Sequence, residues 1–92
     1  MNRISRKVTI VNDRGLHARA SAKFVTIVSR LPDGLIVEVE KDGQTVTGGS
    51  IMGLMMLGAA KGHDIKIHVE GNEAEKVADK LVGLVVDGFG ED

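Results

Sequence analysis

Residues 7–34 read KVTIVNDRGLHARASAKFVTIVSRLPDG, and the spacing of apolar residues in this stretch indicates the fold. Lys7 to Val11 alternates apolar and polar side chains, which predicts a half-buried strand. From Leu16 to Leu31 the apolar residues recur every three or four positions, which predicts an amphipathic helix. A Pro32-Asp33-Gly34 turn ends that helix. The chain therefore begins with a strand, a loop and a helix.

The same two periodicities continue through the rest of the chain. Asp42-Gly43 lies between two alternating segments and predicts a hairpin, because both residues tolerate positive φ. Further strands and helices are expected at 35–40, 44–47, 50–57, 65–70 and 74–85. Because the strands alternate, one sheet face is covered and the other is solvated, so every helix must lie on the covered face. This order predicts a two-layer α/β sandwich, formed by a single domain over residues 1–92.

The composition excludes several functional classes. Hydrophobic residues make up 42% of the chain and charged residues 27%, as in folded proteins and unlike disordered ones. The absence of cysteine excludes disulfides, thiol catalysis and cysteine-based zinc sites. A net charge of -1 and an aromatic content of 2% argue against nucleic-acid binding, which usually needs a basic surface and stacking side chains.

We also expect neither a membrane span nor a targeting signal. The longest apolar stretch, Ile51 to Ala60, has about half of the roughly 20 residues that a membrane-spanning helix needs. No apolar core follows the basic residues at the N-terminus, so a secretory signal is not expected. These absences favour a cytoplasmic location. At the other end of the chain, Glu91-Asp92 is expected to be a loose tail.

Gly15-Leu16-His17-Ala18-Arg19 forms the junction between the first loop and the first helix. His17 occupies the N-cap position, where Ser, Thr, Asp or Asn would be better. The first-turn amides of Ala18 and Arg19 have no intrahelical partner and favour an anion, phosphate most of all. The Arg19 guanidinium adds donors suited to phosphate oxygens, and a neutral imidazole nitrogen is a nucleophile. We therefore expect His17 to carry a phosphoryl group, the alternative being an exposed capping histidine without a function.

Two motifs point to one family. Gly15-Leu16-His17-Ala18-Arg19 resembles the active-site signature of the HPr family, the histidine-containing phosphocarriers of the bacterial phosphotransferase system. Gly49-Ser50-Ile51-Met52-Gly53-Leu54-Met55, followed by Gly58, resembles the family's second signature, around a regulatory serine. The resemblance extends from about Arg6 to Val86. It implies an open-faced sandwich, with an antiparallel sheet in strand order 1-4-2-3 beneath three helices.

The resemblance also implies roles and partners. His17 would accept a phosphoryl group at Nδ1 from phosphoenolpyruvate-charged enzyme I and pass it to a IIA-type domain, in sugar uptake or nitrogen-related regulation. Arg19 matches the arginine that steadies the phosphate, and Ser50 matches the serine that an HPr kinase modifies in some bacteria. The protein would be a monomeric carrier with a phosphohistidine intermediate rather than a free-standing enzyme, with no cofactor or metal. The alternative is a regulatory interaction module controlled by phosphorylation of Ser50.

Ala20 departs from the family pattern, which usually has proline at this position. Alanine keeps an amide N–H and loses the preset φ of proline, so we expect phosphoryl transfer to survive with altered rates. Similar variants occur in some nitrogen-related systems, and Ala20 therefore favours that branch.

The predicted helix at 50–57 has two apolar faces, of which a two-layer fold can bury only one. We expect its leucines inside and its methionines largely exposed, since methionine suits a surface that must fit several partners. The resemblance places partner docking on this helix, and Ile51, Met52 and Met55 are the expected contacts. The alternative is that the methionines fill gaps in the core. Ser50 has two compatible interpretations, as an N-cap and as a phosphorylation site.

Other polar residues are expected to have structural roles. His68 lies on the predicted solvated sheet face and His63 in the loop before it, too far apart and with too few further ligands for a metal site. Hydrolase activity is disfavoured, because local spacing places no base or orienting acid near His17 or Ser50.

Overall fold

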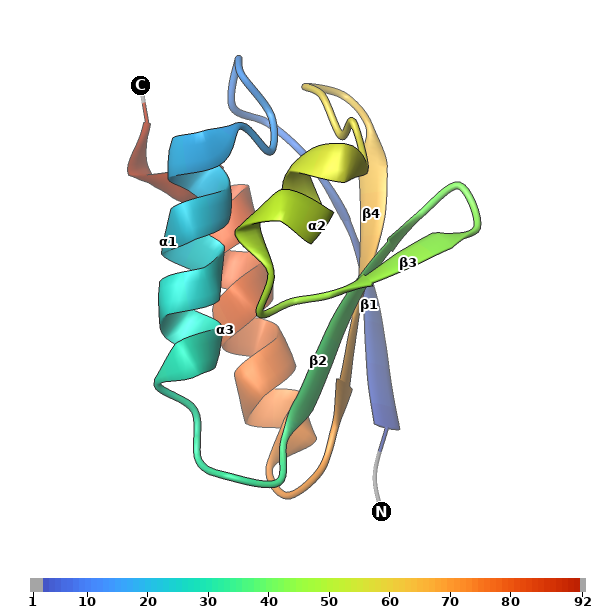
Figure 1. Ribbon diagram of the computed structural model, residues 1–92, viewed down its shortest axis with the longest axis vertical. Helices are drawn as coiled ribbons and strands as arrows, with labels where there is room; N and C mark the ends of the chain where they lie inside the picture. The colour runs from blue at the N-terminus through green and yellow to red at the C-terminus, as the bar shows by residue number, and fades with distance from the viewer. Residues whose placement is uncertain (1–2, 92) are drawn as a thin grey trace.

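The computed structural model describes residues 3–91, which form one antiparallel sheet covered on one face by helices (Figure 1). In chain order the elements are β1 (Arg3–Thr9), α1 (Ala18–Ser29), β2 (Ile36–Lys41), β3 (Gln44–Thr47), α2 (Ile51–Met56), β4 (Asp64–Glu70), α3 (Ala74–Val86) and a short 3-10 helix, η1 (Gly88–Gly90). The strand order is β1-β4-β2-β3. The predicted open-faced sandwich is therefore confirmed, together with its strand order.

The core lies between the sheet and the helices. The inward side chains of the central strand β4 are almost fully buried: Ile65, Ile67 and Val69. From the helices, Phe24 of α1 and Leu81 of α3 pack into the same cluster. The polar positions between the inward strand residues lie on the opposite, uncovered face, as the alternation predicts.

The first strand lies further toward the N-terminus than its alternation predicts. The alternating pattern covers Lys7 to Val11, whereas β1 pairs with β4 from Arg3 to Thr9. Ile10 leaves the ladder, since its amide bonds to the His63 carbonyl at 2.9 Å in the loop before β4. The partner strand sets the length of β1, because β4 begins at Asp64, opposite Thr9.

The hairpin between β2 and β3 forms as predicted. Asp42 and Gly43 have φ values of 51° and 82°, the left-handed conformation that this two-residue turn requires. In Figure 1 the hairpin projects away from the helices at one edge of the sheet. The strands of the hairpin still belong to the core, because Val39 of β2 is fully buried and Val46 of β3 packs against the core cluster.

His68 is not solvated as expected. It lies on β4 with 8% of its surface exposed, although its neighbour Lys66 on the same face is exposed. Ser5 Oγ lies 2.7 Å from His68 Nδ1, and Glu40 Oε1 lies 2.8 Å from Nε2. The prediction is wrong because β4 is a central strand, so side chains from β1 and β2 cover the ring on both sides.

Within residues 3–91, no helix has the length and apolar character that crossing a membrane demands.

Candidate functional site

Gly15 fixes the loop that leads into α1. Its φ is 60°, and a Cβ built at this position would lie 2.2 Å from the Ala59 carbonyl oxygen. The next amide, Leu16 N–H, donates to that same carbonyl at 2.9 Å. The loop can thus approach the 59–60 backbone closely only because residue 15 has no side chain. This approach sets the position of His17, two residues later.

We predict that Gly15→Ala strongly destabilises the fold. The left-handed conformation alone costs about 1–2 kcal/mol for alanine, and the clash with the Ala59 carbonyl raises the total to about 3 kcal/mol or more. Gly58→Ala is the matched control, because Gly58 has φ 63° but a Cβ added to it would meet nothing within 4 Å. Urea unfolding of both variants measures the difference, and equal losses of stability would show that the close approach is unimportant.

His17 is the N-cap of α1. Its backbone is extended, with φ -74° and ψ -178°, and its carbonyl accepts the first helical hydrogen bond from the Ser21 amide at 2.9 Å. The ring also caps, because the Arg19 amide donates to Nδ1 at 3.3 Å. The expectation that the Arg19 amide is unpaired is therefore wrong. The bond is long, so the amide is only weakly engaged.

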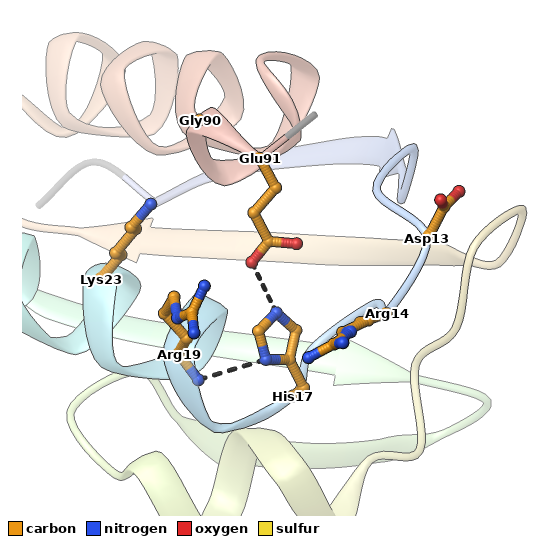
Figure 2. A pocket seen from close by; sticks show the side chains of 7 residues that line it. All are labelled: Asp13, Arg14, His17, Arg19, Lys23, Gly90 and Glu91. Carbon is orange, nitrogen blue, oxygen red and sulfur yellow. Dashed lines mark hydrogen bonds and ion pairs between the residues drawn. The ribbon is translucent and has the colours of Figure 1, made fainter.

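Glu91 lies against the other nitrogen of the ring. Its Oε2 is 2.5 Å from His17 Nε2, and the two side chains are 16% and 22% exposed (Figure 2). The expected loose tail is therefore wrong for Glu91, while Asp92 lies outside the described residues. The segment is held because Phe89 is fully buried and its carbonyl accepts from Lys23 Nζ at 2.5 Å.

Charged side chains surround the ring on several sides. A cavity of about 470 Å³ is lined by Asp13, Arg14, His17, Arg19, Lys23, Gly90 and Glu91 (Figure 2). Within residues 3–91 neither arginine of this set forms an ion pair. The Asp13 carboxylate pairs with Lys61 at 2.9 Å and not with either arginine, and this pairing lowers the pKa of the Asp13 carboxyl. Cations and a nearby helix N-terminus make this cavity suited to a small anion such as a phosphoryl group.

The Glu91 carboxylate is stabilised in its charged form. Partial burial alone would raise the pKa of Glu91, but hydrogen bonds from His17 and Asn12 outweigh it, and Lys23 adds a favourable charge. The net effect holds the pKa of the carboxyl below its ordinary value. At neutral pH the ring therefore faces an ionised carboxylate.

The sequence did not indicate three residues of this site. Asn12 and Arg14 lie in the loop before the motif, and Glu91 is 74 positions from its partner His17. The prediction that local spacing places no orienting acid near His17 does not cover Glu91, because this carboxylate reaches the ring from the other end of the chain. The one signal for the end of the chain is an apolar Phe89 between two glycines, which indicates a buried anchor.

The second motif begins α2, which packs against α1 (Figure 1). Ser50 is the N-cap, and its Oγ accepts from the Gly53 amide at 2.9 Å, so its capping role is confirmed. Leu54 is fully buried, whereas Met52 is 71% and Met55 43% exposed. Filling of the core by the methionines is thus excluded, and together with Ile51 they form an exposed apolar patch.

A metal centre has no evident position in the part of the chain that the structure describes. Within residues 3–91, no three His, Cys, Asp or Glu side chains gather in a way that would hold a metal ion. His63 Nδ1 accepts from the Ala60 amide at 3.1 Å, which accounts for one of its ring nitrogens.

Comparisons with known proteins agree with the geometry of the His17 site. A family model described as the phosphotransferase-system HPr component phosphorylation site matches residues 4–87. The phosphocarrier protein HPr of Pseudomonas putida is 42% identical over 87 residues, covering 95% of this chain and 96% of that protein. HPr of Neisseria meningitidis serogroup A is 41% identical over 88 residues, covering 96% and 97%. The crystal structure of HPr from Bacillus anthracis str. Ames superposes with a TM-score of 0.84 at 35% identity, covering 92% of this chain and 99% of that one.

Proposed function

Because the chain belongs to the HPr family of phosphocarriers of the phosphotransferase system, we propose that His17 carries the phosphoryl group on Nδ1. Family membership implies enzyme I as the donor and IIA-type domains as acceptors. We further propose that the carrier acts as a single-domain monomer in the cytoplasm. Ala20 in place of proline favours the nitrogen-related branch over sugar uptake.

One observation supports this assignment above all others. The His17 ring lies at the N-terminus of α1, partly exposed, in a cavity that Arg14 and Arg19 also line. When Nδ1 receives a phosphoryl group its lone pair is consumed, so the Arg19 amide must leave the ring. The same amide, the Ala18 amide and the Arg19 guanidinium then have phosphate oxygens as acceptors. Nδ1 thus serves as a temporary cap that the phosphate replaces.

The rate of the transfer step depends mainly on how the reacting groups are positioned and on how well the charge on the phosphoryl group is stabilised. The donor P–N bond breaks as the P–Nδ1 bond forms, through a loose transition state whose charge is spread over the phosphoryl oxygens. The arginines that line the cavity and the N-terminus of α1 are already in place to stabilise that charge, so the main local change is the transfer of the Arg19 amide from Nδ1 to a phosphate oxygen. Because the phosphoryl group must move on, these donors hold it at an open surface rather than in a closed pocket.

Incubation with enzyme I and phosphoenolpyruvate tests the proposal. We expect a mass increase of one phosphoryl group that acid removes, since phosphohistidine is acid-labile. Subsequent addition of a IIA-type domain should remove the group from the carrier. No phosphate gained from enzyme I, together with an acid-stable phosphate on Ser50 in a parallel incubation with an HPr kinase and ATP, would contradict the relay and support the regulatory module instead.

Phosphorylation of Ser50 by an HPr kinase is a second proposed reaction, and its place in the fold supports it. Ser50 is partly exposed at the start of α2, beside Ile51 and Met52. A phosphate there would keep the N-cap, because the helix N-terminus favours negative charge. It would also place about two negative charges next to the apolar patch, where a partner docks.

We predict that Met52→Glu and Met55→Glu weaken enzyme I binding while the protein stays folded. A buried charge at the centre of an apolar interface lowers affinity by about 10-fold or more. Both side chains are exposed in the free protein, so the free energy of unfolding should change by less than about 0.5 kcal/mol. Titration calorimetry measures the affinity. Val86→Glu is the control, because Val86 is an apolar residue of α3 with 61% exposure; equal weakening by it would contradict the assignment of the patch.

A further inference from the structure

The carboxylate that contacts the His17 ring has a consequence beyond binding a phosphoryl group. We propose that Glu91 is a positioning residue, which fixes the tautomer of His17 and retains the Nε2 proton while the ring is phosphorylated. The inference rests on the proposed function of His17. It is carried by the 2.5 Å contact between Glu91 Oε2 and Nε2, on the opposite side of the ring from the Arg19 amide (Figure 2).

Glu91 is held in place from several elements. Asn12 Nδ2 donates to Glu91 Oε1 at 3.1 Å and to the Gly15 carbonyl at 2.9 Å. Asn12 is buried, and its Oδ1 has no partner among the described residues. Leaving a buried oxygen without a hydrogen bond lowers the stability of the fold. The Asn12 amide nitrogen, in return, hydrogen-bonds both the Glu91 side chain and the loop before His17. Phe89 anchors the same segment in the core.

The two contacts of the ring select one tautomer. A backbone amide can only donate, so the bond from Arg19 N–H requires an unprotonated Nδ1. An ionised carboxylate can only accept, so the contact with Glu91 requires a proton on Nε2. Together they leave the lone pair on Nδ1, the nitrogen that attacks phosphorus. The nucleophilic atom is thus specified before a donor arrives.

The same carboxylate matters after transfer. When Nδ1 attacks, the P–Nδ1 bond forms, the donor bond to phosphorus breaks, and the Nε2 proton stays on a ring that is now positively charged. On onward transfer the P–Nδ1 bond breaks, and the ring departs as neutral imidazole if that proton is still present. Without the proton it would depart as imidazolate, a far poorer leaving group. Glu91 opposes loss of the proton because it stabilises the charged ring.

Other charges at the site act in the opposite direction. Arg14, Arg19 and Lys23 line the cavity and disfavour a further positive charge on the ring, while Asp13 is bound by Lys61. Glu91 is therefore the carboxylate in contact with the ring that offsets these cations. Removing its charge should let the phosphorylated ring lose its proton at a lower pH.

Glu91→Gln tests this role, because glutamine keeps the size of the side chain and removes its charge. Nitrogen-15 NMR of the labelled ring should show a smaller fraction of the Nε2–H tautomer in the unphosphorylated variant. In the phosphorylated variant, the midpoint pH for loss of the Nε2 proton should fall by about 1 unit. Onward transfer to a IIA-type domain should slow by about 10-fold above that midpoint and approach the wild-type rate below it.

Glu75→Gln is the control, because Glu75 is 73% exposed on α3 and should leave all three measurements unchanged. A Glu91→Gln variant with wild-type tautomer and midpoint would overturn the proposal. If wild-type His17 is phosphorylated normally in that experiment, the function of His17 stands and only the role of Glu91 is lost. Absence of phosphate on wild-type His17 would instead contradict the proposed function itself.

Discussion

Replacing His17 with asparagine is expected to abolish phosphorylation by enzyme I and phosphoenolpyruvate. The rate of phosphoryl transfer should fall by at least about 10³-fold, as expected when a nucleophilic side chain is removed. Asparagine is among the best N-cap residues, so α1 should keep its cap and the protein its stability. The variant therefore separates the chemical role of the ring from its capping role. Phosphate incorporation is measured by mass spectrometry and stability by thermal unfolding.

The two remaining histidines provide the control for His17→Asn. His63 is exposed and His68 is enclosed by Ser5 and Glu40, so neither has the cations and helix amides that surround His17. His63→Asn should retain full phosphorylation. Acid-labile phosphate that persists in His17→Asn would place the phosphoryl group elsewhere and contradict the assignment.

Replacing Phe89 with alanine is expected to destabilise the fold strongly and to release Glu91 from the His17 ring. Phe89 is fully buried beneath the end of α3, and truncating a buried phenylalanine costs about 3–5 kcal/mol. A domain of this size has about 5–15 kcal/mol of stability, so much of the protein should remain folded at low temperature. Urea unfolding at 10–15 °C, roughly where stability is highest, measures the loss.

Phe24→Ala is the matched control for Phe89→Ala. Phe24 is 1% exposed in α1, so its truncation removes a similar buried volume at a position outside the 88–91 segment. Both variants should lose similar stability, but only Phe89→Ala should release Glu91 and reproduce the NMR change expected for Glu91→Gln. The same ring tautomer in the two variants would show that burial of Phe89 does not position Glu91.

Three features were well predicted because their signals are local. The helical spacing after Leu16, the Asp42-Gly43 hairpin and the capping role of Ser50 each depend on a few neighbouring residues. Exposure of the methionines followed from a single further argument, that a two-layer fold buries only one face of α2. The errors lie where a distant partner decides, as for the start of β1 and the burial of His68.

Local sequence patterns were enough to predict a two-layer sandwich, a candidate reactive histidine and the donors that adjoin it, because periodicity, turn residues and the loop-to-helix junction are properties of short segments. The groups on the far side of the His17 ring are known only from the folded structure. Folding brings Glu91 into contact with His17, which is 74 residues away in the sequence, and Asn12 into contact with Glu91. No local pattern encodes these contacts. A short segment sets only its own backbone conformation and which of its faces is buried. The charges that meet across such faces are set only when the whole core has packed.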